Sequence, residues 1–198
     1  MSDWLAYHST NEANMVDAWL AGLRMTGIEI ENYKAGKSRD WEDDIYKTGL
    51  RQDYNISLSG KKENFSYYWS LGYMDNEALT IGDEFSTIRS RVNIEGNATS
   101  FLKVGLNAQF SYRDESSVPA DNGQYQDLMP YGSYYTDDGE DLRYLPNDDI
   151  QARHPLLLRT FRSREQQHYT FSPKIYSILD LPFGITYTMN FTTRLEFY

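Results

Sequence analysis

Apolar and polar side chains alternate with a period of two in four consecutive segments between residues 52 and 113. In the first segment, Tyr54, Ile56 and Leu58 are separated by small polar residues. The segments are residues 53–59, 64–73, 88–97 and 102–113. Only a pleated strand places residues i, i+2 and i+4 on the same side of the backbone. The pattern therefore predicts strands that each have one apolar face and one polar face.

Two more strands are predicted near the C-terminus. The first has an apolar face from Tyr169 to Leu179, and the second runs from Ile185 to Leu195. The connections between the segments alternate in length. Residues 60–63, 97–101 and 180–184 are short turns, whereas residues 75–84 and 114–163 are longer. Short turns at one end and long loops at the other are typical of outer-membrane barrels, whose long loops face outward.

The two faces of the predicted strands differ in composition. The apolar faces are rich in Tyr and Trp near the segment ends, and the opposite faces carry rows of Arg, Lys, Asn, Gln and Ser. A membrane barrel has this arrangement, because aromatic residues lie at its two interfaces and polar residues line its wet interior. A soluble β-sandwich also has alternating strands, with the apolar faces packed on each other. The sequence predicts an all-β chain forming part of an antiparallel transmembrane β-barrel, and the sandwich stays open as the alternative.

Short helices are predicted near the N-terminus. An amphipathic helix is expected over residues 10–24 and is ended by Gly27. A second helix is expected between a capping box that starts at Thr26 and a stop at Gly36. Residues 40–49 are expected to form one helical turn that anchors the entry to the first strand.

The predicted elements divide the chain into two parts. Residues 1–48 form an extracellular loop with the short helices, and residues 49–198 form part of a β-barrel. Within the second part, residues 114–163 make a long outer loop. The dipeptide Asp138–Gly139 predicts a small hairpin inside this loop.

Composition narrows the class of protein further. The 198 residues carry a net charge of -10, no Cys and a mean hydropathy of -0.67. The acidic balance argues against a nucleic-acid partner, which would need a clustered basic face. No stretch approaches the ~18 to 20 apolar residues of a membrane helix, so a helical membrane protein is excluded. The N-terminus has no export signal. Because an outer-membrane protein must be exported, we expect a piece of a longer chain, with Met1 as an internal methionine.

Ordered motifs occur in the register of the predicted strands. They are DWEDDIYKTG at 40–49, QDYNISLSG at 52–60, YYWSLGYMDNE at 67–77 and FLKVG at 101–105. Weaker ones follow, with DG at 138–139, PLL at 155–157 and LPFG at 181–184. Together these motifs resemble the SusC/RagA-type TonB-dependent outer-membrane transporters, and the resemblance covers most of residues 27–198.

The resemblance implies a barrel of about 22 strands closed by an N-terminal plug, of which this chain supplies about six strands. It implies TonB-driven import of glycan or peptide nutrients across the outer membrane of a Gram-negative bacterium. The implied partners are outer-membrane lipid, the missing plug and remaining barrel, a SusD-like surface lipoprotein, and TonB through a segment absent here. Two alternatives stay open: a complete small outer-membrane barrel with an adhesive or structural role, and a soluble carbohydrate-binding β-sandwich.

Candidate solute-contact residues are cations on the polar faces and tyrosines in the long loop. The cations are expected to line the solute path or to pair with plug carboxylates, and a hydrated ladder without solute contact is the alternative. The tyrosines are expected to stack on sugar faces or to pack the loop against itself. The cations are Arg89, Arg91, Lys103 and Arg113. The tyrosines are Tyr125, Tyr131, Tyr134, Tyr135 and Tyr144.

Metal and catalytic sites are weakly indicated. Asp137, Asp138 and Asp141 are candidates for a Ca²⁺ site because hard oxygen ligands are dense there. Their spacing does not fit an EF-hand, and solvated loop charge is favoured. The histidines lack metal-ligand spacing; they are His8, His154 and His168. No nucleophile arrangement, phosphate loop or dinucleotide fingerprint occurs. The chain is therefore predicted to bind and conduct solute without catalysis and without a cofactor.

Overall fold

The computed structural model of the protein describes residues 12–198, which form two compact units. Unit 1 contains the N-terminal segment up to Thr48, together with Leu79–Gly82 and Val118–Arg162. Unit 2 contains Gly49–Ala78, Asp83–Ser117 and Ser163–Tyr198. Within the described residues, the α-helices belong to unit 1 and the strands belong to unit 2.

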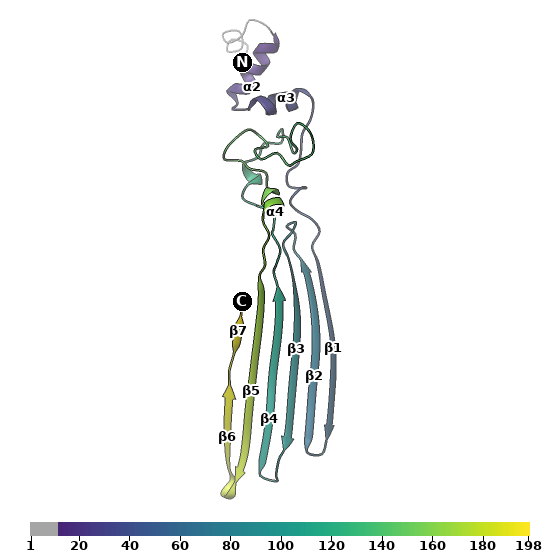
Figure 1. Ribbon diagram of the computed structural model, residues 1–198, viewed down its shortest axis with the longest axis vertical. Coiled ribbons are helices and arrows are strands. Elements are labelled where there is room, and N and C mark those ends of the chain that lie inside the picture. The colour runs from purple at the N-terminus through teal and green to yellow at the C-terminus, as the bar shows by residue number, and fades with distance from the viewer. Residues whose placement is uncertain (1–11) are drawn as a thin grey trace. The chain divides into compact units, whose positions relative to one another are not determined.

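Unit 2 is a single antiparallel sheet of seven strands in the order β1-β2-β3-β4-β5-β6, and β7 also pairs with β5 (Figure 1). The strands are β1 Leu50–Lys62, β2 Phe65–Glu77, β3 Glu84–Asn97, β4 Leu102–Asp114, β5 Gln167–Leu181, β6 Ile185–Thr192 and β7 Leu195–Phe197. The predicted segments correspond to β1, β2, β3, β4 and β5, and the last one corresponds to β6 and β7 together. The prediction of an all-β chain with antiparallel strands is confirmed.

The pairing register keeps side chains of one character on one face of the sheet. Leu58 pairs with Trp69, and Trp69 pairs with Val92 in the next strand. Further along the sheet, Leu106 pairs with Ile175. Residues directly opposite each other in a ladder point to the same face. The sheet therefore presents one apolar face and one polar face.

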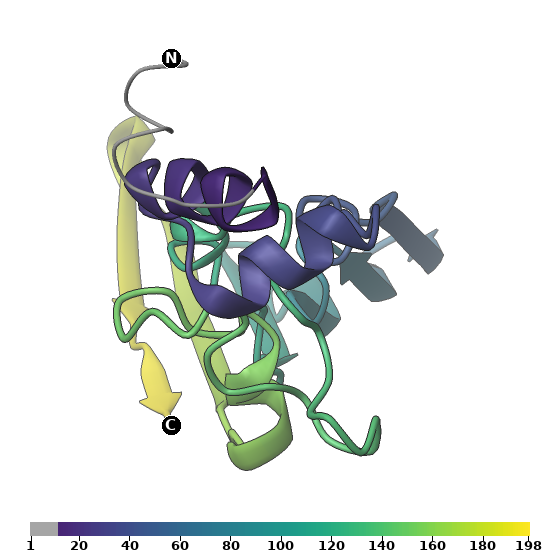
Figure 2. The ribbon, with the colours of Figure 1, turned by 90° about the horizontal axis from the view of Figure 1, so that it is seen from above.

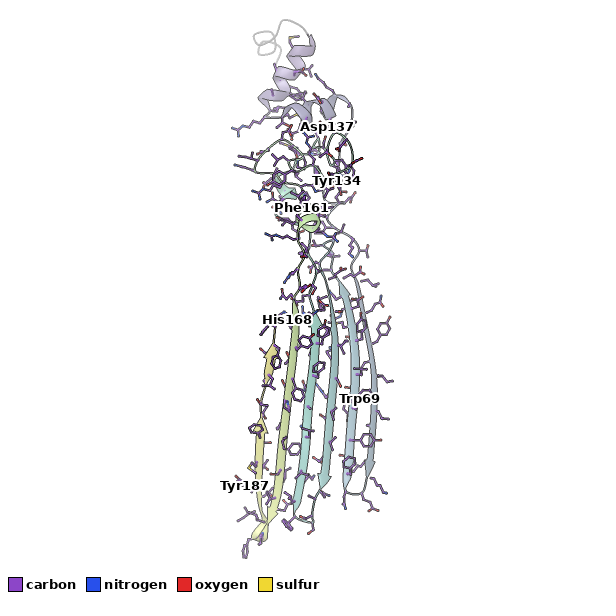
Figure 3. The ribbon with its side chains drawn as sticks, viewed as in Figure 1. Trp69, Tyr134, Asp137, Phe161, His168 and Tyr187 are labelled. Carbon is purple, nitrogen blue, oxygen red and sulfur yellow. The ribbon has the colours of Figure 1, made fainter. Side chains whose placement is uncertain are left out.

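Within unit 2, no second layer covers the apolar face. Ile56, Leu58 and Phe191 are 64%, 58% and 65% exposed. Figure 3 shows side chains, with Trp69 and Tyr187 among those labelled, projecting from a single layer of strands. The buried apolar side chains of the described residues, such as Ile45, lie in unit 1. A sandwich needs apolar faces packed on each other, so the soluble-sandwich alternative is wrong.

The last strand of the sheet is divided into β6 and β7 because β5, with which it pairs, contains a proline. The register on β5 is the same on both sides of the gap, since Lys174 pairs with Thr192 and Phe171 pairs with Leu195. Thr193 donates its backbone N–H to the carbonyl of Pro173 at 3.2 Å. Pro173 has no N–H with which to return the bond. One ladder bond is missing, and the single predicted strand is observed as two.

The connections between strands alternate in length, as predicted. Residues 63–64 join β1 to β2, residues 98–101 join β3 to β4, and the 3-10 helix η2 (Pro182–Gly184) joins β5 to β6. The connections after β2 and β4 are residues 78–83 and 115–166, and both pass through unit 1. Because consecutive strands are antiparallel, the three short turns share one end of the sheet and the longer connections leave the other end.

Two helices, which contact each other, open the described part of unit 1 (Figure 2). Helix α2 spans Glu12–Gly22 and helix α3 spans Gly27–Lys34. The prediction that Gly27 ends the first helix is wrong. The chain leaves the helix after Gly22, and Arg24 takes a left-handed φ of 65°. Gly27 is instead the first residue of α3.

Both ends of α3 have the predicted local structure. At its start, the backbone N–H of Thr26 donates to the Glu29 carboxylate at 2.7 Å, which forms half of a capping box. At its end, Gly36 has a φ of 67°. The backbone N–H groups of Gly36 and Lys37 donate to the carbonyls of Tyr33 and Asn32. These two bonds form a Schellman motif, which fixes the direction in which the chain leaves the helix.

The N-terminal segment and the long connection after β4 share the core of unit 1. Trp41 and Ile45 are 4% and 0% exposed. The indole N–H of Trp41 donates to the backbone carbonyl of Met129 at 2.9 Å. The long connection also contains the 3-10 helix η1 (Tyr125–Asp127) and helix α4 (Leu157–Phe161). No helix in residues 12–198 is long and apolar enough to cross a bilayer.

The predicted hairpin in the long connection is present. Tyr135 and Leu142 form an isolated antiparallel bridge, and Gly139 has a φ of 76° at the tip. Thr136 donates its backbone N–H to the carbonyl of Asp141 at 2.9 Å. Glycine adopts this φ without steric cost, so the Asp138–Gly139 dipeptide accounts for the turn.

Candidate functional site

The polar face of the sheet carries a hollow of about 470 Å³. Its lining comes from β1 to β5 and from Arg194. Polar residues such as Asn55, Ser70, Gln109 and Ser172 form much of this lining. Two of the predicted cations, Arg89 and Arg91, lie in it as well. The strands therefore bring amide, hydroxyl and guanidinium groups together on one surface.

Arg89 reaches across a neighbouring strand to form an ion pair. Its guanidinium donates to both carboxylate oxygens of Asp53, at 2.9 and 3.0 Å. Arg89 belongs to β3 and Asp53 to β1, and the residue between them on β2 is Gly72, which pairs with Arg89. Because Gly72 has no side chain, the arginine passes over it. The pair neutralises Arg89 within the chain.

Lys103 and Arg113 also have acidic partners within the chain. The Lys103 ammonium lies 3.5 Å from the Glu95 carboxylate, which accepts a hydrogen bond from the Tyr176 hydroxyl at 2.7 Å. Arg113 pairs with Glu115. By contrast, Arg91 forms no ion pair within the described residues. The four cations therefore share one face of the sheet, and Arg91 is the one among them whose charge is not compensated locally.

Tyr134 is held in the core of unit 1 by three neighbours. The guanidinium carbon of Arg39 lies 3.8 Å from the centre of its ring. Trp41 stacks on it with ring centres 5.9 Å apart, and His154 meets it edge-on at 4.5 Å. Arg39 also forms a bidentate ion pair with Asp44. Burial raises the pKa of Tyr134 above its ordinary value.

The other tyrosines of the long connection differ in how they are placed. Tyr125 meets Tyr46 edge-on at 5.9 Å, and Tyr131 meets Tyr33 in the same way at 5.2 Å. Tyr135 and Tyr144, by contrast, are 50% and 53% exposed. The structure places Tyr135 beside Tyr134, with ring centres 4.6 Å apart, and does not bring all five tyrosines into one cluster.

The acidic residues of the hairpin do not form a metal-ligand group. Within the described residues, no set of three or more His, Asp or Glu side chains is arranged to hold a metal ion. Asp137 pairs with Arg143 at 3.0 Å. The Thr136 hydroxyl and the Glu140 backbone N–H hydrogen-bond to Asp138, which lowers the pKa of that carboxyl. Asp141 contributes its backbone carbonyl to the hairpin.

The histidines lie in separate places. His154 is 2% exposed in unit 1, and its Nδ1 accepts the backbone N–H of Leu156 at 3.2 Å. His168 pairs with Arg113 near the start of β5 in unit 2 and meets Tyr198 edge-on at 4.9 Å. His8 lies outside the described residues. The described histidines therefore do not meet at a common site.

Unit 1 contains a second hollow, of about 250 Å³, that sequence reasoning did not find. It lies between the end of α3 with the following segment and the stretch Gly132–Tyr135. Of the predicted residues, Tyr134 and Tyr135 line it, and Lys37 and Arg39 are new. The two walls are about a hundred residues apart in the chain, and no local pattern indicates that they meet.

The sheet is a single antiparallel layer that is apolar on one face and polar on the other, and its first and last strands are unpaired at the edges. These features define part of the wall of a β-barrel of the outer-membrane type. The comparisons with known proteins agree with this class. The chain is 27% identical over 174 residues to the TonB-dependent receptor P3 of Formosa agariphila, which is 81% of this chain and 17% of that protein. It is 35% identical over 75 residues to the TonB-dependent receptor SusC of Bacteroides thetaiotaomicron, which is 36% of this chain and 7% of that protein.

A solved structure gives the same fold. The RagAB peptide importer in its closed-closed state matches with a TM-score of 0.63 and 21% identity, over 80% of this chain and 19% of that one. No family model matches the chain. The chain thus spans less than a fifth of these relatives. The resemblance to SusC/RagA-type TonB-dependent transporters is confirmed, and the fold is that of a part of their barrel.

Proposed function

We propose that this chain forms part of the barrel wall of a TonB-dependent importer in the outer membrane of a Gram-negative bacterium. The observation that carries the proposal is the exposed apolar face of the single-layer sheet, opposite a polar face with its own hollow. The apolar face meets lipid and the polar face meets the solute path. The named relatives support the choice of importer over a small adhesive or structural barrel.

The proposed importer takes up glycan or peptide nutrients and performs no catalysis. The plug, the rest of the barrel and the segment that contacts TonB lie outside this chain, and a SusD-like lipoprotein covers the outer opening. Bare strand edges at β1 and at β6 are the places where the remaining strands of the barrel pair. The sheet contributes solute contacts and not a complete channel.

Within this proposal, Arg91 is the one of the four predicted cations that contacts solute. Arg89, Lys103 and Arg113 form ion pairs with carboxylates of the same chain. Arg91 lines the hollow without an ion pair among the described residues. A guanidinium without an ion-pair partner has N–H donors that are available to bind solute.

The experiment is uptake by cells in which the full-length transporter is deleted and then restored. A panel of glycans and peptides is supplied, and we expect deletion to abolish uptake of one class and disruption of TonB to do the same. Restoration with Arg91→Gln should lower that uptake severalfold, whereas Lys62→Gln, at the short β1–β2 turn, should not. Unchanged uptake of the whole panel after deletion contradicts the importer, and full uptake with Arg91→Gln contradicts only the role of Arg91.

A further inference from the structure

The smaller hollow in unit 1 has walls that are fixed before any ligand binds. On one side, the Schellman motif at Gly36 sets the path of Lys37 and Ser38. Asn32 bridges to the other side, because its side-chain amide donates to the carbonyl of Tyr131 at 2.8 Å and to the Ser133 hydroxyl at 3.0 Å. A preformed wall lowers the entropy cost of binding.

Backbone bonds join the two sides of the hollow as well. Arg39 donates its backbone N–H to the carbonyl of Pro130 at 2.7 Å. Ser133 donates to Pro146, and the carbonyl of Tyr134 accepts the backbone N–H of Arg143. The side chain of Tyr134 is in turn fixed by its neighbours in the core. The hollow is therefore part of the folded structure of unit 1.

The charge of the lining has one sign. Lys37 and Arg39 are its charged side chains, in a chain whose net charge is -10. Arg39 is compensated by Asp44, but Lys37 forms no ion pair among residues 12–198. The excess positive charge favours a ligand that carries an anionic group.

The uncharged part of the lining suits a sugar ring. The hydroxyl groups of Ser38 and Ser133 both donate and accept hydrogen bonds, as sugar hydroxyls do. Tyr135 is half exposed at the hollow, and an aromatic ring offers an apolar face to the C–H groups of a sugar. The volume of about 250 Å³ is enough to hold about one ring.

We propose that this hollow is a binding subsite for one carboxylated sugar unit of a glycan, with the carboxylate at Lys37 and the ring against Tyr135. The proposal names the substrate class of the importer and so depends on the proposed function. It differs from the role of Arg91, because the subsite lies in unit 1 and belongs to the outer loops of that transporter.

The test uses the purified full-length transporter in detergent, titrated with methyl glucuronide, methyl glucoside and an acidic dipeptide. We expect the glucuronide to bind more tightly than either of the others. Lys37→Gln should weaken glucuronide binding about threefold to fivefold, as expected for an exposed ion pair, and leave the glucoside unchanged. Lys34→Gln, which removes a helical lysine paired with Asp17, is the matched control and should have no effect.

A second variant and a second measurement keep the subsite testable. Tyr135→Ala should weaken both sugars, and saturation-transfer NMR should give the largest signals on the ring protons. Equal affinity for glucuronide and glucoside, tighter binding of the dipeptide, or unchanged affinity in Lys37→Gln overturns the subsite. Uptake in cells is measured separately, so failure of these binding tests leaves the proposed importer unaffected. The importer proposal itself fails if deletion of the transporter leaves uptake of the whole panel unchanged.

Discussion

His154 is a histidine that the fold keeps neutral. Its ring lies between Trp41, at 5.5 Å, and Tyr134, at 4.5 Å, and its Nδ1 accepts the Leu156 backbone N–H. Burial lowers the pKa of His154 from its usual 6.5 to about 4. A charged imidazolium in this position would lose most of its hydration without gaining a carboxylate in contact with it.

Unit 1 should therefore lose stability as the pH falls from about 6.5 toward about 4. In the unfolded segment His154 takes up a proton near pH 6.5, whereas in the folded segment it stays neutral until the pH approaches about 4. Above the upper value both states are neutral and the effect is absent. Amide hydrogen exchange of residues 118–162, corrected for intrinsic pH dependence, should show the opening constant rising by up to about tenfold per pH unit.

His154→Gln should flatten this pH dependence even if it also lowers stability at neutral pH. His168→Gln is the control, since His168 lies in the sheet of unit 2. A slope that survives His154→Gln assigns the pH dependence to another group.

At the scale of elements, two strands of the sheet are fitted together by a glycine and a tyrosine. Gly105 of β4 pairs with Tyr176 of β5, and a Cβ at Gly105 would lie 2.1 Å from the Tyr176 ring. The ring therefore lies over the glycine, and its hydroxyl reaches Glu95 on β3. An aromatic ring over a glycine compensates for the missing side chain and helps to fix the register.

Gly105→Ala should displace the Tyr176 ring and break its hydrogen bond to Glu95. We expect a loss of about 1.5 to 3 kcal/mol in unfolding free energy, the size of one hydrogen bond to a charged group. Urea unfolding of the full transporter in lipid gives the measurement. In a Tyr176→Phe background the same substitution should have a smaller effect, with a coupling of at least about 0.5 kcal/mol. Additive effects would mean that the ring and the glycine are independent.

Alternation along the chain was sufficient to predict the strands, their faces and the placement of the short turns. The ladders from β1 to β5 run along nearly the whole length of these strands, so the period of two is visible locally. The break between β6 and β7 was not predicted. The N–H that Pro173 lacks interrupts the neighbouring strand and leaves β5 itself continuous. The end of α2 was also misplaced, since Arg24 turns the chain before the glycine.

The candidate sites were less accessible to sequence reasoning. Alternation placed the four cations on one face, but the partner of Arg89 depends on a glycine in the strand between them. Tyr134 was singled out as a loop aromatic, and its contacts with Arg39 and Trp41 join segments far apart in the chain. Such contacts depend on tertiary packing, which leaves no local period.

At the scale of the whole molecule, the proposed function places lipid against the apolar face of the sheet and water against its polar face. Leu71 and Ser70 are adjacent on β2 and point to opposite faces. The chain contains no cysteine, so a single introduced thiol reports one position. The assignment of lipid to one face and water to the other can therefore be tested at neighbouring residues.

Leu71→Cys should be protected from a water-soluble maleimide in the membrane-embedded full transporter, and Ser70→Cys should be labelled. Cysteines outside this chain are replaced first, and a lipid-soluble maleimide serves as the control for reactivity of both thiols. Labelling of Leu71→Cys as fast as Ser70→Cys by the water-soluble reagent contradicts the proposed orientation of the sheet.

The unbroken register from β1 to β5 limits how such a protein can diverge. One residue added inside a strand would exchange the two faces for the remainder of that strand, and polar side chains would then stand on the apolar face. One residue added to the connection at 115–166 moves nothing in the ladder. Insertions and deletions are therefore tolerated at the end of the sheet with the long connections, so related proteins can change these connections while they keep the same ladder of strands.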